Sequence, residues 1–175
     1  MGLADHSNFL AFSKPFMEGA QAVFKTMIST DLVAGKPKIK EESDSLSDLT
    51  AVINISGNLD DKPYQALLVI SWPYSTYVKM SSAMLQEEYA EYNKEIKDVG
   101  AEISNMITGN AKRDLNKLGY TCSMAIPTMI EGKGHKLNYP NGTTIVYFPI
   151  NCDHGEFVIE ICYTDSFKTR QTKSS

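Results

Sequence analysis

Residues 98–113, which read DVGAEISNMITGNAKR, decide how the rest of the chain is interpreted. They lie inside the longest helical pattern of the sequence, which we expect to run from about residue 87 to residue 118 and to end at Gly119. Apolar residues recur along this segment at the spacing of one helical face: Tyr92, Ile96, Val99, Ile103, Met106, Ile107, Leu115 and Leu118. The pattern predicts a long helix with one buried face.

The opposite face of this helix carries polar residues and a glycine at one-turn intervals. At about 100° per residue, the exposed positions are Asp98, Glu102, Asn105, Gly109, Lys112 and Asn116. Glu102 and Asn105 are at positions i and i+3, so their side chains project side by side. A glycine inside a helix costs roughly 0.5–1 kcal/mol relative to alanine, and close approach of another molecule at Gly109 could offset that cost. Periodicity alone leaves open a simpler interpretation, a face that is merely solvated.

The other segments predict an α+β fold. Residues 16–27 carry the apolar spacing of a first helix, with Pro15 in its first turn. Shorter patterns predict a helix at 75–84, a polar loop at 41–48, a turn at 58–61 and strands near 35–40, 49–57, 64–72, 121–129, 144–150 and 156–163. Each half of the chain therefore reads as a helix followed by antiparallel strands, a suspected structural repeat. The simplest architecture is an antiparallel sheet covered on one face by long helices.

Length and composition limit the classes of protein that remain. We expect one domain over all 175 residues, with an ordered core at about 8–165 and a flexible tail at 168–175. The net charge of −4 and the scattered lysines argue against a nucleic-acid partner. No apolar run reaches the roughly 20 residues that span a bilayer, and the N-terminus lacks the pattern of a secretory signal. We expect a cytoplasmic protein that binds neither nucleic acid nor membrane.

The cysteines and histidines give no sign of a metal centre. Cys122, Cys152 and Cys162 are expected to be reduced, buried thiols. His6, His135 and His154 are far apart in the sequence, and Cys152 and His154 lack companion ligands. We expect no metal or cofactor of the protein's own.

Residues 98–113 closely resemble the signature helix of the CheX chemotaxis phosphatases, within the wider CheC/CheX/FliY group. The Glu-x-x-Asn pair of that group falls on Glu102 and Asn105. Further similar positions are the MITGNA run at 106–111, Pro15-Phe16, the Ile-Ser-Gly run at 55–57 and residues 126–132. The resemblance covers roughly residues 16–163 and implies a CheC-like fold.

The resemblance implies hydrolysis of the aspartyl phosphate on a CheY-like receiver domain, which brings its own Mg²⁺ and lysine. In that mechanism Asn105 places the attacking water and Glu102 pairs with the receiver's lysine. Asp98, Gly109 and Lys112, on the same face, are expected to contact the partner. The family also implies a homodimer.

Two alternatives remain beside the phosphatase. The first is a non-catalytic module of the same fold that binds a receiver or assembles in a signalling complex, and the second is an unrelated scaffold with a solvated helix face. A second active site would lie on the first helix, where Glu18 and Gln21 stand in place of Glu-x-x-Asn. We interpret this pair as ordinary helix-surface residues and expect one active site.

Overall fold

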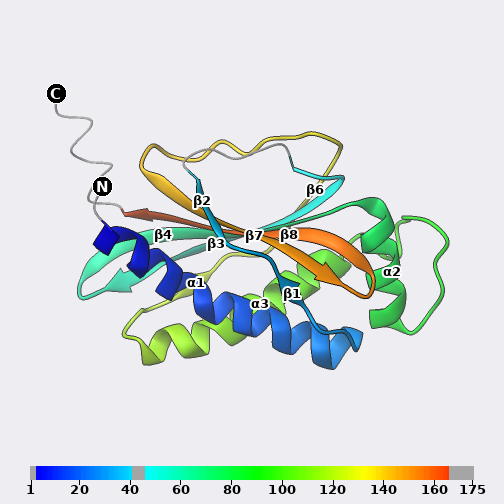
Figure 1. Ribbon diagram of the computed structural model, residues 1–175, viewed down its shortest axis with the longest axis horizontal. Coiled ribbons are helices and arrows are strands. Elements are labelled where there is room, and N and C mark those ends of the chain that lie inside the picture. Colours follow the sequence, from blue (N-terminus) through cyan, green and yellow to red (C-terminus); the bar gives the residue numbers. More distant parts are fainter. Residues whose placement is uncertain (1–2, 41–45, 166–175) are drawn as a thin grey trace.

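The computed structural model describes residues 3–40 and 46–165. In this part of the chain, eight strands form one antiparallel sheet, and two long helices, α1 and α3, lie across one of its faces (Figure 1). The predicted α+β architecture is confirmed. The predicted tail at 168–175, and residues 41–45 of the predicted loop, lie outside the described residues. None of the helices in the described ranges is both long enough and apolar enough to cross a membrane.

The elements follow one another in two similar series. The helical segments are α1 (Leu3–Val23), the π-helical turn η1 (Phe24–Ile28), α2 (Tyr74–Leu85) and α3 (Val99–Lys117). The strands are β1 (Val33–Ala34), β2 (Lys38–Lys40), β3 (Leu49–Leu59), β4 (Lys62–Trp72), β5 (Ser123–Met124), β6 (Thr128–Glu131), β7 (Thr143–Cys152) and β8 (Gly155–Asp165). The order across the sheet is β1-β7-β8-β4-β3-β5, while β2 also pairs with β7 and β6 also pairs with β3.

This pairing supports the suspected repeat. Each half of the chain runs through a long helix, two short strands and a long hairpin: α1, β1, β2, β3–β4 and then α3, β5, β6, β7–β8. The two short strands of each half pair with the first hairpin strand of the other half. The two halves therefore interlock in one sheet.

Alternation along the long strands separates the two faces of the sheet. On β3, Leu49, Ala51 and Ile53 are fully buried and join the core beneath the helices. Asn54, which points to the other face, is exposed. A smaller apolar cluster on that face lies under the connection between β6 and β7, which arches over the sheet in Figure 1. The turn predicted at 58–61 is also found. It connects β3 to β4, and Asp60 and Asp61 both have positive φ angles there (49° and 61°).

The long helix starts later than predicted. It begins at Val99 instead of near residue 87, so the prediction was wrong over residues 87–98. At the end of α2, Gln86 adopts a left-handed backbone with φ 55°, which turns the chain out of helical geometry. Tyr92 then packs on the rings of Tyr74 and Tyr77, with centroids 5.3 and 5.9 Å away. This tertiary packing outweighs the helical propensity of the segment.

The first helix, in contrast, starts earlier than predicted. It begins at Leu3, and Pro15 stands inside it rather than in its first turn. Phe12 is 1 % exposed and packs on Phe16 and Tyr64, with ring centroids 5.4 and 5.6 Å away. The area buried on the N-terminal side of the proline offsets the helical hydrogen bond that Pro15 cannot donate.

Smaller corrections concern helix ends and strand continuity. Met27 is 43 % exposed because the helix widens into η1, which buries Ile28 instead. Leu118 is 56 % exposed at the C-cap of α3. Of the strand predicted at 35–40, only residues 38–40 form a strand (β2), and β1 precedes the predicted range. The strand predicted at 121–129 is split into the two short strands β5 and β6.

Candidate functional site

The exposed face of α3 is present as predicted. Asp98, at the N-cap, and Glu102, Asn105, Gly109, Lys112 and Asn116 are all exposed. Ile103 and Ile107, on the opposite face of the helix, are fully inaccessible and belong to the core. A single face of α3 thus presents the whole predicted set of site residues.

The side chains of Glu102 and Asn105 are available to a partner. Within residues 3–40 and 46–165, neither takes part in a side-chain hydrogen bond or an ion pair. Glu102 lies in the first turn of α3, where the positive end of the helix dipole stabilises a carboxylate. Asn105 offers one amide oxygen as an acceptor and one NH₂ group as a donor.

Hydrogen bonds and close packing on the buried side of α3 fix the position of the helix that carries Glu102 and Asn105. The Ser104 hydroxyl donates to the Gly100 carbonyl and the Thr108 hydroxyl donates to the Ser104 carbonyl, both at 2.8 Å, so the buried polar groups are satisfied. Helix α1 approaches closely at Gly19, where an added Cβ would lie 2.9 Å from the Ile107 carbonyl oxygen. Position and orientation of the exposed face are therefore set by tight packing.

Tyr77 of α2 fixes the start of α3. Its hydroxyl accepts a hydrogen bond from the Gly100 N–H at 2.8 Å and donates to the Ile96 and Lys97 carbonyls, each at 2.9 Å. Burial raises the pKa of the Tyr77 hydroxyl, so that it stays protonated and able to donate. The turn that leads to Glu102 is thereby tied to α2.

Replacing Tyr77 by phenylalanine tests this anchor. Tyr77→Phe leaves the Gly100 N–H without its acceptor and removes the donor shared by the Ile96 and Lys97 carbonyls, and we expect the free energy of unfolding to fall by about 1–3 kcal/mol. Urea denaturation measures the loss, and Tyr89→Phe is the control because the Tyr89 hydroxyl bonds to the exposed carboxylates of Glu87 and Glu95. Equal stability of the two variants would contradict the anchoring role.

A shallow groove lies beside Asn105. It is lined by Asn105 and Lys112 of α3 and by Met124, Ala125, Ile126 and Pro127, the link between β5 and β6. Ile126 is 88 % exposed, the most exposed of the large apolar side chains in the described residues. Periodicity did not single out Ile126, although the Ile-Pro pair inside a strand-like run is a signal of an interrupted edge strand.

Gly109 faces open space. A Cβ added at this position would have no heavy atom within 4 Å, which rules out a packing role within the described structure. Gly100, on the buried side of the same helix, is different: its added Cβ would lie 2.9 Å from Trp72 Cζ3 and 3.0 Å from Tyr77 Cε2.

Two substitutions at Gly109 separate its effects on stability and on docking. We expect Gly109→Ala to stabilise the free protein by roughly 0.8–1.0 kcal/mol, because alanine has the higher helix propensity. We expect Gly109→Leu to leave the protein folded but to block docking of a receiver, the partner that the resemblance implies. Thermal denaturation and a receiver-binding titration measure the two effects, with Gly100→Ala as a destabilising control. Normal receiver binding by Gly109→Leu would show that this surface is solvated in the complex.

The first helix does not present a matching pair. Glu18 is exposed and lies 3.8 Å from Lys14 in an ion pair. The amide of Gln21 is engaged: its Oε1 accepts from the Leu32 N–H at 3.2 Å and its Nε2 donates to Asp31 at 3.4 Å. Gln21 holds the loop after η1 and is not available in the way that Asn105 is.

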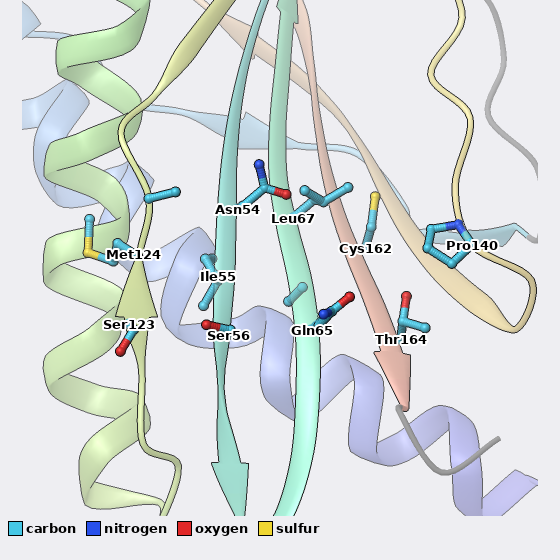
Figure 2. Close-up of a pocket in the computed structure, with 12 residues that line it drawn as sticks. Asn54, Ile55, Ser56, Gln65, Leu67, Ser123, Met124, Pro140, Cys162 and Thr164 are labelled. Atoms are coloured by element: carbon cyan, nitrogen blue, oxygen red, sulfur yellow. The ribbon is translucent and has the colours of Figure 1, made fainter. Parts of the chain in front are cut away.

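A second hollow lies on the sheet face away from the helices. Figure 2 shows Asn54, Gln65, Leu67 and Thr164 on the strands that form it, with Pro140 at its side. Its titratable group is Cys162, and burial raises the pKa of this thiol, which disfavours the reactive thiolate. The hollow is a weaker candidate for chemistry than the face of α3.

The cysteines are free, with Cys122 and Cys162 buried as predicted and Cys152 half-buried. Within the described ranges, no group of three or more His, Cys, Asp or Glu side chains is placed to hold a metal ion.

Comparison with known proteins identifies the family. Residues 49–151, more than half of the chain, match the family described as chemotaxis phosphatase CheX. The fold and the exposed helix face agree with this match, and the chain belongs to the CheX family. No curated protein sequence is significantly similar to it.

Solved structures agree with this assignment. The chemotaxis protein CheX from Vibrio vulnificus is 31 % identical, with a TM-score of 0.76 over 87 % of this chain and 99 % of that chain. A CheC-like superfamily protein from Shewanella sp. PV-4 is 29 % identical, with a TM-score of 0.78 over 87 % and 96 %. A CheX–CheY–BeF₃–Mg²⁺ complex from Borrelia burgdorferi shares the fold at 21 % identity, with a TM-score of 0.71 over 87 % and 96 %.

Proposed function

We propose that this protein is a phosphatase that hydrolyses the aspartyl phosphate of a CheY-like response-regulator receiver. The observation that carries the proposal is the pair Glu102 and Asn105 on one exposed turn of α3, both without a side-chain partner in the described residues. A carboxylate and an amide that have no partner within the described residues, held on a rigid helix, can form hydrogen bonds and an ion pair with another molecule without first rearranging.

Asn105 is the catalytic residue in the proposed reaction. Its amide oxygen accepts a hydrogen bond from a water and holds the water oxygen in line with phosphorus and the aspartyl oxygen. A bond forms between the water oxygen and phosphorus while the bond from phosphorus to the aspartyl oxygen breaks. The electron pair of that bond returns to the aspartate, and the water protons pass to the released phosphate and to solvent. Orienting the water requires no base in the protein.

Glu102 acts in docking. Its carboxylate and the phosphoryl group are both anionic, so direct contact between them is unfavourable. A lysine of the receiver is the complementary partner, and an ion pair with it would orient α3 over the phosphoryl group. Asp98, Gly109 and Lys112 would contact the partner on either side of this pair.

The choice of partner is supported by a protein of the same fold. The B. burgdorferi CheX was crystallised with CheY, BeF₃ and Mg²⁺, and BeF₃ on a carboxylate mimics an aspartyl phosphate. The Mg²⁺ that neutralises the phosphoryl oxygens would come with the receiver. The homodimer implied by the family and the cytoplasmic location expected from the sequence remain predictions.

The rival is a module of the same fold that binds a receiver without catalysis. The available Asn105 amide favours the enzyme, because binding alone would need no water-positioning group at the centre of the surface.

The test is the decay of a phosphorylated CheY-like receiver with and without the protein. We expect faster release of inorganic phosphate from the receiver and no acceleration for acetyl phosphate, which lacks the receiver's lysine and Mg²⁺ site. Unchanged receiver decay in the presence of tight binding would favour the non-catalytic module.

A further inference from the structure

The link between β5 and β6 contains a β-bulge beside Asn105. On its partner strand β3, Ile55 pairs with Met124, and the Asn54 carbonyl accepts from the Ala125 N–H at 2.9 Å. Two residues before Asn54 on β3, Val52 pairs with Thr128. Ile126 and Pro127 thus lie opposite the single residue Ile53, which is the register shift of a bulge.

This bulge explains the orientation of Ile126. A bulge bends an edge strand and redirects a side chain, and Pro127 fits there because it has no N–H to offer the sheet. Ile126 is left 88 % exposed, lining the same groove as Asn105 and Lys112. Substitution at so exposed a position usually changes stability by no more than about 0.5 kcal/mol, so the fold itself does not require an isoleucine there.

The first half of the chain contains a matching bulge. On β7, Ile150 pairs with Ala34, and the Pro149 carbonyl accepts from the Gly35 N–H at 2.8 Å. Tyr147 then pairs with Lys38, so Lys36 and Pro37 lie opposite one residue.

The two bulges differ in the residue that precedes the proline. It is an exposed lysine, Lys36, in the first half and an exposed isoleucine, Ile126, in the second. The helix of the first half also lacks an available amide, because Gln21 is bonded to Leu32 and Asp31. The apolar side chain therefore occurs only in the half that carries Glu102 and Asn105.

We propose that Ile126 is the apolar anchor with which the protein recognises its phosphorylated receiver, an assignment that rests on the phosphatase function proposed above. The receiver surface around the phosphoryl group would bury Ile126 while Asn105 reaches the phosphorus. Lys112, on the other side of the groove, complements the acidic groups that a Mg²⁺ site requires. Ile126 is a specificity residue in this arrangement and takes no part in the chemical step.

The test is the steady-state kinetics of receiver dephosphorylation by full-length variants. Burial of the three side-chain carbons that Ile126→Ala removes corresponds to a rise in KM of roughly tenfold to fiftyfold, with kcat nearly unchanged. We expect Ile126→Lys, which introduces the residue of the matching bulge, to raise KM further, and Ile126→Leu to retain most of the affinity. Lys36→Ala is the matched control and should leave KM and kcat at wild-type values.

The outcomes distinguish this assignment from the function on which it rests. If the wild-type protein does not accelerate receiver decay, the proposed function and the assignment of Ile126 both fail. If the wild-type protein is active and Ile126→Ala has the wild-type KM, only the assignment fails. A lower kcat at unchanged KM would also overturn it, as would sedimentation showing that Ile126→Lys dissociates a dimer, because Ile126 would then belong to a contact between copies.

Discussion

Asn105→Ala lowers the maximal rate of receiver dephosphorylation by about 100-fold or more, the magnitude typical of a lost positioning or charge-stabilising group in an active site. The amide is expected to hold the attacking water, and no other group of the exposed α3 face lies on the same turn with both an acceptor and a donor. Because Asn105 is exposed and its side chain is unbonded, the variant keeps its thermal stability and its affinity for the receiver. Single-turnover decay at saturating phosphatase measures the chemical step alone.

Asn116 provides the matched control for this experiment. It is an exposed asparagine on the same face of α3, near the end of the helix. Asn116→Ala removes the same atoms and should retain the wild-type rate. A rate for Asn105→Ala equal to that of Asn116→Ala would mean that the water is positioned by another group.

Glu102→Lys has the second largest expected effect, and the effect is on binding. The substitution replaces attraction to the receiver's lysine by repulsion, and we expect the Kd for a beryllofluoride-activated receiver to rise by about 100-fold, against about tenfold for Glu102→Ala. Both effects should shrink as the salt concentration rises, because an exposed ion pair is screened. Isothermal titration calorimetry at two salt concentrations measures the Kd of each variant and the dependence of that Kd on salt.

Glu88→Lys controls for the change in net charge, since Glu88 is exposed on the loop before α3. If Glu102→Lys and Glu88→Lys weaken binding equally, the effect comes from the overall charge of the protein. Unchanged affinity in both Glu102 variants would remove Glu102 from the docking surface.

Sequence periodicity predicted the parts of the fold that depend on local pattern. The alternation of apolar and polar residues on β3 identified buried positions such as Ile53 and Ile55. The 3.6-residue period likewise identified the exposed face of α3, since burial of Ile103 and Ile107 forces Glu102 and Asn105 outward. The repeat of apolar residues along a helix defines its buried face and therefore also its exposed face. The exposed positions of the candidate site residues could thus be predicted from the buried residues of the same helix.

Features that depend on contacts distant in sequence were not predictable in this way. The start of α3 is determined by Tyr77 and by the packing of Tyr92, which lie on separate segments. The exposure of Ile126 depends on a register shift against β3, a strand about seventy residues earlier in the chain. Alternation within residues 121–129 is compatible with a continuous strand, and only the pairing partner shows that the strand is broken.

The most direct measurement is the loss of phosphate from a phosphorylated CheY-like receiver present in large excess over the protein. A phosphatase that uses Asn105 releases many phosphates per protein molecule, and Asn105→Ala almost stops this turnover while Asn116→Ala does not. Release that stops at one phosphate per protein molecule, or that is the same in wild type and Asn105→Ala, would contradict catalysis by the exposed face of α3.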